Sequence, residues 1–182
     1  MNKYHAHFTL ANNCELIAPK DFKRTEIFLQ DRFQVQHDVM LTKYYGGKSF
    51  SEQGQMVEEV LQDAKRFGNL LRVKLEYQGD DVHEAFTLHH ENYVEAHVKV
   101  QTDSPEELFE FAKTIDGVRS RNPKSEGLYF VNFRVYGQEY SCAKDAIDGE
   151  IALIKEFGEV QPNPHVEVAI FDSNLAHDAW WA

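Results

Sequence analysis

Five segments of the chain alternate apolar and polar residues with a period of two, which is the pattern of β-strands that bury one face. They are residues 3–11, 70–78, 92–101, 128–137 and 165–171. In the first of them, His5, His7 and Thr9 share one face and the intervening apolar residues share the other. Each strand therefore offers one face to a core and keeps a polar face outside it.

Three segments between these strands carry apolar residues at helical spacing instead. They are residues 51–68, 104–115 and 141–158. The second has the clearest start, because Ser104 and Glu107 fit a capping box and Pro105 fits the first helical position. We expect these helices to cover the apolar face of a sheet.

The order of the elements is β-α-β, β-α-β and a final α-β. It predicts an α+β fold, a ferredoxin-like βαββαβ sandwich with an added C-terminal α-β unit, in one domain over residues 1–182. In that arrangement strands 3–11 and 92–101 are neighbours in the middle of the sheet. Residues 12–50 are too long for an ordinary connection. We expect them to be an insertion or a lid over the open sheet face, with His37 or Lys43 reaching that face.

Composition narrows the class of protein further. The formal net charge of -11 opposes sequence-independent binding to nucleic acid. The chain has no apolar run long enough to span a membrane and no signal-peptide pattern at its start, so we expect a cytoplasmic protein without membrane contact. Cys14 and Cys142 lack metal-ligand spacing and fit a reducing compartment. The sequence leaves the oligomeric state open.

The polar residues of the predicted central and flanking strands would gather on one uncovered surface. They are His5, His7, Thr9, Arg72, Lys74, Glu76, Glu95, His97, Lys99, Asn132 and Arg134. A solvated sheet face needs polar residues in any case. Histidines at the centres of both middle strands are not its usual choice, so we interpret this surface as a candidate site.

Two imidazoles on either side of a phosphodiester can act as general base and general acid. The string HFT at residues 7–9 resembles the His-x-Thr motif of the two-histidine phosphoesterases, which include cyclic phosphodiesterases and RNA ligase-like proteins. In that family each half of the fold supplies one such motif. The resemblance implies that His7 and His97 are the acid–base pair and that Thr9 and Lys99 bind phosphate. The second motif departs from the family, because it reads HVK, with Lys99 in the place of Thr or Ser.

The expected function is thus that of a phosphoester-binding protein, and if it is an enzyme, a phosphodiesterase-type hydrolase. The partner would be a small phosphorylated ligand or a nucleotide. We expect the ligand to contact the polar face through side chains that donate or accept hydrogen bonds beside the two catalytic histidines. These substrate-binding candidates are His5, Thr9, Arg72, Lys74, Glu95, Lys99 and Arg134.

The C-terminal half carries a second resemblance. The strings YVEAHVKV, SRNP, FRVYG and IFDSNLAHDAWW resemble an uncharacterised family of small microbial proteins. The resemblance implies a recurring constellation without indicating its chemistry. Its members are Glu95, His97, Lys99, Arg121, Arg134, Asp172, Asn174 and Asp178.

Two alternatives stay open. His5, His7 and His97 with Glu95 could hold zinc or another divalent ion. Lysine and arginine side chains on the same face would repel a cation, and we therefore expect no metal and no cofactor. The polar face could instead belong to a non-enzymatic ligand-binding or oligomeric regulatory module.

Overall fold

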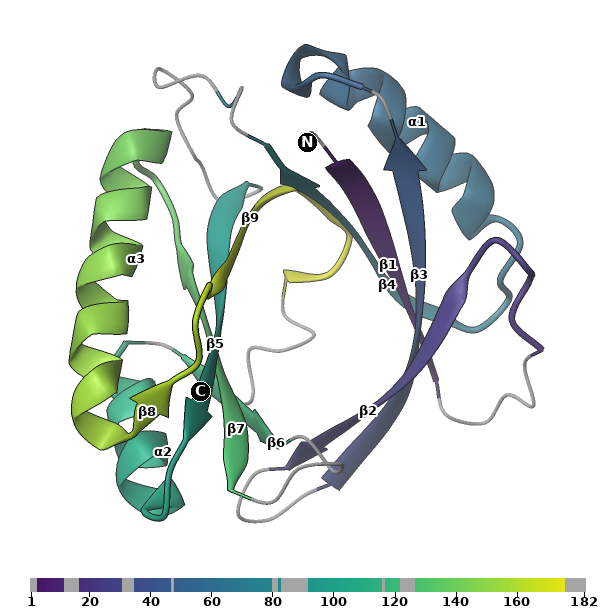
Figure 1. Ribbon diagram of the computed structural model, residues 1–182. Coiled ribbons are helices and arrows are strands. Elements are labelled where there is room, and N and C mark those ends of the chain that lie inside the picture. Colours follow the sequence, from purple (N-terminus) through teal and green to yellow (C-terminus); the bar gives the residue numbers. More distant parts are fainter. Residues whose placement is uncertain are drawn as a thin grey trace.

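The computed structural model describes residues 3–11, 17–30, 35–46, 48–79, 82, 92–115, 117–121 and 127–175. In this part of the chain nine strands form one curled antiparallel sheet, with helices on its outer side (Figure 1). The strands are β1 (Lys3–Ala11), β2 (Lys23–Gln30), β3 (Val35–Gly46), β4 (Leu70–Gln78), β5 (Tyr93–Gln101), β6 (Val118–Arg121), β7 (Leu128–Val135), β8 (Glu159–Val160) and β9 (His165–Asp172). The helices are α1 (Gln53–Ala64), α2 (Pro105–Thr114) and α3 (Tyr140–Ile154).

These elements confirm the α+β class. The predicted strands and helices correspond to β1, β4, β5, β7 and β9 and to α1, α2 and α3, with ends shifted by a few residues. Helix α3 buries the apolar stripe that predicted it, with Ala143, Ile147, Ile151 and Ile154, whereas α1 buries Met56, Val60 and Ala64 and leaves Leu61 exposed. The Ser104 side chain makes no capping hydrogen bond at the start of α2, although Pro105 stands at its first position as expected.

The strand order differs from the predicted one. The sheet runs β2-β3-β1-β4-β9-β5-β7-β6, and the short β8 pairs with β5. The prediction that residues 3–11 and 92–101 are neighbouring strands is therefore wrong, because β4 and β9 lie between β1 and β5. Alternation shows which face of a strand is buried, but it does not show which strand lies beside it.

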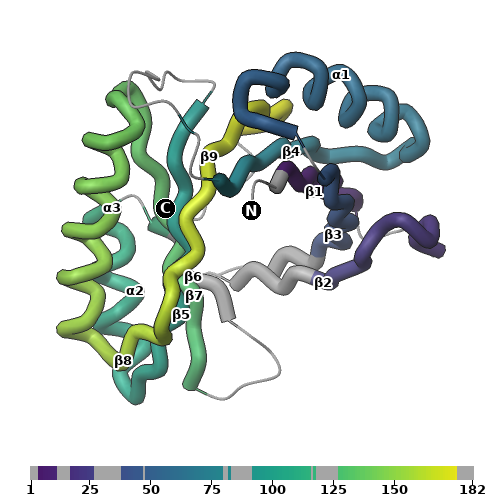
Figure 2. The backbone as a smooth tube through the Cα atoms, turned by 45° about the horizontal axis from the view of Figure 1, so that its top comes forward, coloured from purple at the N-terminus to yellow at the C-terminus, as the bar shows by residue number. Residues whose placement is uncertain are grey.

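The observed order repeats one topology in two halves. In the first half β1 lies between β3 and β4, with β2 outside β3, and in the second half β5 lies between β7 and β9, with β6 outside β7. The helix that precedes the last strand is α1 in one half and α3 in the other. Figure 2 shows α1 outside one half and α2 and α3 outside the other. The halves meet where β4 pairs with β9, and Tyr77 lies opposite Val168 at that seam.

Residues 12–50 are built into the sheet where the structure describes them. They supply β2 and β3, which pair with each other, and β3 pairs with β1. Lys43 was expected on the polar face, but it lies on the helix side, where its Nζ is 2.7 Å from Asp63 Oδ2 of α1. The side chain of His37 and residues 12–16, 31–34 and 47 are outside the described part.

The core lies between the sheet and the helices. Tyr4, Phe8, Leu75 and Val98 are among its fully buried side chains. Their strand neighbours point to the concave side of the curled sheet, away from the helices. No helix in the described ranges is long and apolar enough to cross a membrane.

Candidate functional site

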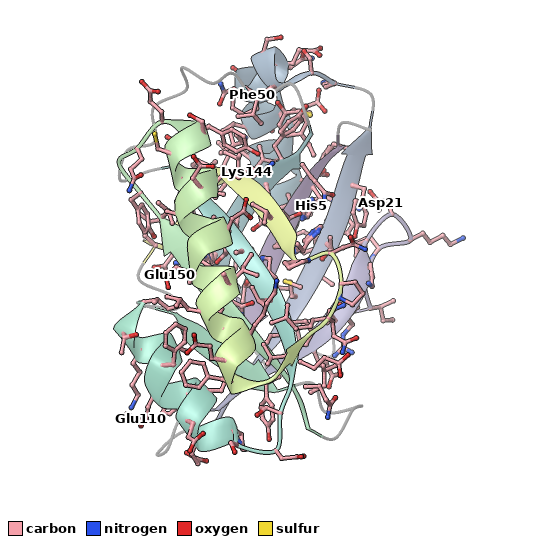
Figure 3. The ribbon with its side chains drawn as sticks, turned by 60° about the vertical axis from the view of Figure 1, so that its left-hand side comes forward. His5, Asp21, Phe50, Glu110, Lys144 and Glu150 are labelled. Carbon is pink, nitrogen blue, oxygen red and sulfur yellow. The ribbon has the colours of Figure 1, made fainter. Side chains whose placement is uncertain are left out.

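Ionisable side chains from four adjacent strands meet on the concave side of the sheet. They come from alternate positions of β1, β4, β5 and β9, and we call them the concave cluster: His5, His7, Glu76, Glu95, His97 and Glu167. Figure 3 shows His5 among side chains between β1 and β9, whereas Lys144 and Glu150 belong to α3. The cluster crosses the seam between the two halves, because β4 and β9 are the strands that join them.

Glu76 is the centre of the cluster. Its residue is fully buried, and its Oε2 lies 2.8 Å from His7 Nε2 and 3.2 Å from His5 Nε2. Its other oxygen, Oε1, lies 2.6 Å from Lys74 Nζ. One carboxylate therefore joins two imidazoles and one ammonium group.

Glu167 holds the corresponding place in the second half. It lies on β9 as Glu76 lies on β4, and its Oε1 is 3.1 Å from His5 Nε2 and 2.7 Å from His165 Nε2. Its Oε2 is 3.7 Å from His97 Nε2. His5 is thus shared between carboxylates from the two halves.

His7 and His97 also occupy equivalent positions. His7 lies on β1 opposite Thr42 of β3, and His97 lies on β5 opposite Asn132 of β7. In each pair the opposite side chain holds Nδ1: His7 Nδ1 is 2.9 Å from Thr42 Oγ1, and His97 Nδ1 is 2.8 Å from Asn132 Oδ1. Both Nε2 atoms then face the carboxylates of the cluster, and each of the two histidines has a ligand atom within 4.8 Å of a Glu76 oxygen.

The pKa values of the two histidines of β1 shift in opposite directions. Burial acts to lower the pKa of His5, but close contacts with Glu167 and Glu76 and the charges of both raise it to about 9. For His7 burial prevails over the attraction to Glu76 and lowers the pKa below its ordinary value. Folding therefore favours the protonated form of His5 and the neutral form of His7.

The buried carboxylates stay ionised. Burial would raise the pKa of Glu95, but the charge of Lys74 outweighs this effect and holds the pKa at about 2. The charge of Lys74, together with His7, likewise lowers the pKa of Glu76 well below its ordinary value against the effect of burial. Each carboxylate therefore requires positive partners in the fold.

The predicted phosphate-binding cations provide these partners. Lys74 contacts both Glu76 and Glu95, and Arg134 Nε donates to Glu95 Oε1 at 2.9 Å. Arg72 Nε donates to Asp172 Oδ1 at 2.8 Å. These cations lie on the predicted face, but each forms an ion pair with a carboxylate of the protein. Lys99 is exposed, with its Nζ 5.7 Å from the centre of the Phe130 ring.

The remaining predicted residues divide between the site and its surroundings. Thr9 is buried beside Arg72, its partner in the register of β1 and β4. Arg121 is described only in its backbone, and Asp178 lies outside the described residues. Sequence reasoning placed Glu76 on the polar face without a role in catalysis or binding, and it left Glu167 and Thr42 out of the site. The signal for the first two was present, because Glu76 and Glu167 occupy polar positions of two alternating segments.

Two groups in the described part of the chain have the composition and spacing of metal ligands. One is His5, His7 and Glu76, and the other is Glu76, Glu95 and His97, with ligand atoms within 4.8 Å of one another in each group. Nitrogen and carboxylate donors of this kind suit zinc and other first-row transition metals.

A pocket of about 910 Å³ lies elsewhere, between α3 and the segment that leads into β9. Its lining includes Tyr77, Lys144, Asp148 and Asn163, and it includes no residue of the concave cluster. The pocket and the ionisable cluster are therefore separate features of the protein.

Comparison with known proteins gives no match to a family model and none to a curated protein.

Proposed function

We propose that the protein binds a phosphoester on the concave face, between His7 and His97, and acts on it as a phosphodiesterase-type hydrolase. The observation that carries this proposal is the equivalence of the two histidines. They stand at the same register position in the two halves, and each has its Nδ1 held by the side chain opposite.

An imidazole with a fixed Nδ1 presents its Nε2 in one direction, which is what proton transfer to or from a bound ligand requires. The side chain of His7 is 17% exposed and that of His97 is 27% exposed, so both reach solvent at the margin of a buried network. On this proposal a phosphoester at that margin takes the place of the contacts that His7 Nε2 makes with Glu76 and that His97 Nε2 makes with Glu95 and Glu167. One ring would accept a proton from the attacking water or hydroxyl, and the other would donate one to the leaving group.

The repeated topology supports the resemblance to the two-histidine phosphoesterases, because in that family each half contributes one motif. Here one half carries His7 and Thr9, and the other carries His97 and Lys99 at equivalent positions. Strand order supports a ferredoxin-like assignment for each half, with the first and third strands side by side in the middle. On this proposal the ferredoxin-like unit is each half, and not a unit formed from β1 and β5 together.

Phosphate recognition would fall to the side chains that the carboxylates leave available. Lys99 is exposed two residues beyond His97 on the same face of β5. The positive charge of His5 stands beside His7 and would attract an anion to the margin of the cluster. Arg72 and Lys74 would act indirectly, by keeping the carboxylates of the cluster in place.

A second candidate function is a non-enzymatic ligand-binding or regulatory module. The observation in its favour is the mutual pairing of Lys74, Arg134, Glu76 and Glu95, which ties up charges that a catalytic phosphate site would use. Such a module would bind a ligand at His7 and His97 without turnover.

The test is turnover of 2′,3′-cyclic nucleotides and of bis(4-nitrophenyl) phosphate by the purified chain. We expect His7→Ala and His97→Ala each to abolish most turnover, and the double variant to be scarcely worse than either, because residues that act as a unit are not additive. His165→Ala is the comparison variant: it removes a half-exposed imidazole at the start of β9, which lies opposite His97 and contacts Glu167, and it should lower turnover far less than either of the other two changes. Binding without turnover by the wild type would favour the second candidate, and full turnover by the double variant would exclude His7 and His97 as the acid–base pair.

A further inference from the structure

We infer that His5 Nε2, His7 Nε2 and Glu76 Oε2 form a binding site for one divalent transition-metal cation. The three donors come from two paired strands, since His5 lies directly opposite Glu76 in the register of β1 and β4. Two imidazoles and one carboxylate are a donor set that zinc and iron use in catalytic sites, with further positions left for water or a substrate.

The separations of the donor atoms suit a shared ion. His5 Nε2 and Glu76 Oε2 are 3.2 Å apart, and His7 Nε2 and Glu76 Oε2 are 2.8 Å apart. With metal–ligand bonds of about 2.0–2.1 Å, these separations correspond to ligand–metal–ligand angles of roughly 85–105°. These two angles lie between octahedral and tetrahedral values, and the ligand atoms of the two histidines lie within 4.8 Å of each other.

Close ionic contacts surround the buried carboxylate oxygens beside the two histidines. Glu76 Oε1 lies 2.6 Å from Lys74 Nζ, and Glu167 Oε1 lies 2.7 Å from His165 Nε2 and 3.1 Å from His5 Nε2. Glu76 Oε2 lies 2.8 Å from His7 Nε2 and 3.2 Å from His5 Nε2, and neither approach has the geometry of a regular hydrogen bond. Oε2 therefore faces two ring nitrogens that a cation could bridge.

The surroundings of His7 fit a metal ligand. A metal-binding histidine usually has its second nitrogen held by a neighbouring side chain, which fixes the ring, and here Thr42 Oγ1 lies 2.9 Å from His7 Nδ1. The side chain of His7 is 17% exposed, so an ion can exchange with solvent from this side. Glu167 stands next to His5 and supplies the nearest additional carboxylate.

Lys74 distinguishes the two candidate groups. Its ammonium contacts both carboxylates of the group formed by Glu76, Glu95 and His97, so that group already holds a positive charge. In the triad with His5 and His7, Lys74 contacts only the other oxygen of Glu76 and leaves Oε2 to the histidines. Lys74 therefore neutralises both carboxylates of the second group, whereas in the triad it contacts the single carboxylate through Oε1, with its charge still acting at His7.

The cation site and the metal-free acid–base pair both use His7, so they are alternative states of the protein, and binding of the cation requires His5 Nε2 to release its proton. A cation on Nε2 of His7 occupies the lone pair that would accept a proton. In the cation-bound protein His7 would hold the metal, an open position would take a phosphoester oxygen, and His97 would be the imidazole left for proton transfer.

The experiment is a titration of the chelator-treated, desalted full chain with Co²⁺, followed by visible absorption, and with Zn²⁺, followed by calorimetry. We expect one ion per chain, d–d bands typical of mixed nitrogen and oxygen ligands, and a higher thermal midpoint with excess metal. His7→Ala and Glu76→Gln should each weaken binding at least tenfold. His97→Ala keeps the triad and is the matched control, with binding like that of the wild type.

The cation site is overturned if the wild-type chain takes up neither ion. This outcome is measured on the wild type alone, so it does not depend on whether a variant folds. Unchanged binding in a folded His7→Ala chain would overturn it too, as would equal loss in His97→Ala. The phosphodiester assay in excess chelator separates the two proposals. Turnover in excess chelator that depends on His7 and His97 upholds the proposed function whatever the metal titration shows, whereas metal uptake without phosphoester turnover upholds the cation site and overturns the proposed function.

Discussion

Arg72 Nε donates a hydrogen bond of 2.8 Å to Asp172 Oδ1, and this contact joins β4 to β9 at the seam between the two halves. The hydroxyl of Tyr93 donates to Asp172 Oδ2 at 2.7 Å from the neighbouring strand β5. The Arg72 residue is only 5% exposed. A buried carboxylate thus receives donors from the strands on both sides of it, next to the concave cluster.

The first prediction concerns the stability of this seam. Arg72→Ala leaves Asp172 buried without its cation, and losing one partner of a buried ion pair typically costs about 3–5 kcal/mol. Urea denaturation at pH 7 should show this loss in the free energy of unfolding. Glu59→Gln is the control, because it breaks the exposed pair with Lys48 and should cost less than about 1 kcal/mol. Equal losses in the two variants would mean that the seam contact has no special role.

The second prediction is a pH dependence of the same contact. Burial tends to raise the pKa of Asp172, but the hydrogen bond and charge of Arg72 outweigh it and keep the pKa below its ordinary value. The ionised form is therefore favoured by folding. This stabilisation is complete above the pKa of aspartate in the unfolded chain, about 3.9, and is lost as the pH falls through the lower folded value.

Urea midpoints of the wild type and of Asp172→Asn between pH 7 and pH 2 measure this dependence. The difference in urea midpoint between the two proteins should be constant above about pH 5 and should decrease in more acidic solution. A gap that stays the same down to pH 2 would show that the charge of Asp172 does not contribute.

The third prediction concerns Lys99, the exposed cation of the proposed phosphate contact. Lys99→Ala should weaken binding of a cyclic nucleotide about fivefold, since a solvent-exposed charge pair contributes on the order of 1 kcal/mol. Calorimetry at low and high salt should show that the difference decreases as salt increases. Lys113→Ala is matched to it, because Lys113 also lies over an aromatic ring, that of Phe109, but on α2. A Lys113 variant that binds as weakly would point to net charge and not to a contact.

The sequence predicts the elements that depend on nearby residues, and it does not predict the strand pairing that depends on distant ones. The alternation of β1, β4, β5 and β9 and the apolar stripe of α3 depend on neighbours a few residues away, and these elements were predicted. The position of β9 between β4 and β5 depends on pairing across the whole second half of the chain. No pattern within residues 165–171 specifies that pairing.

The same reason explains the partial prediction of the site. His5, His7 and His97 were predicted from the polar faces of their own strands, and all three belong to the concave cluster. The central role of Glu76 was not predicted, because it follows from the meeting of β4 and β9, which brings Glu167 within 3.1 Å of His5 Nε2. Arg72 and Lys74 were predicted to face a ligand, but burial gives them carboxylate partners, since a buried carboxylate without a cation is costly.

The last prediction tests the equivalence of the two halves. Thr42→Val and Asn132→Leu keep the approximate size of each side chain and remove the group that holds Nδ1 of His7 or His97. Each should reduce phosphoester turnover about five- to tenfold, because an orienting hydrogen bond is worth on the order of 1 kcal/mol.

Nitrogen-15 NMR of the imidazoles provides a readout that a general loss of stability would not produce. In each variant the tautomer balance should change for the histidine that has lost its partner and stay constant for the other. Thr25→Val, on β2 and outside the site, is the control for loss of a threonine hydroxyl. If the tautomer balance changes while turnover stays at the wild-type level, the orientation of these rings has no part in the reaction, and the symmetry of the two histidines is structural alone.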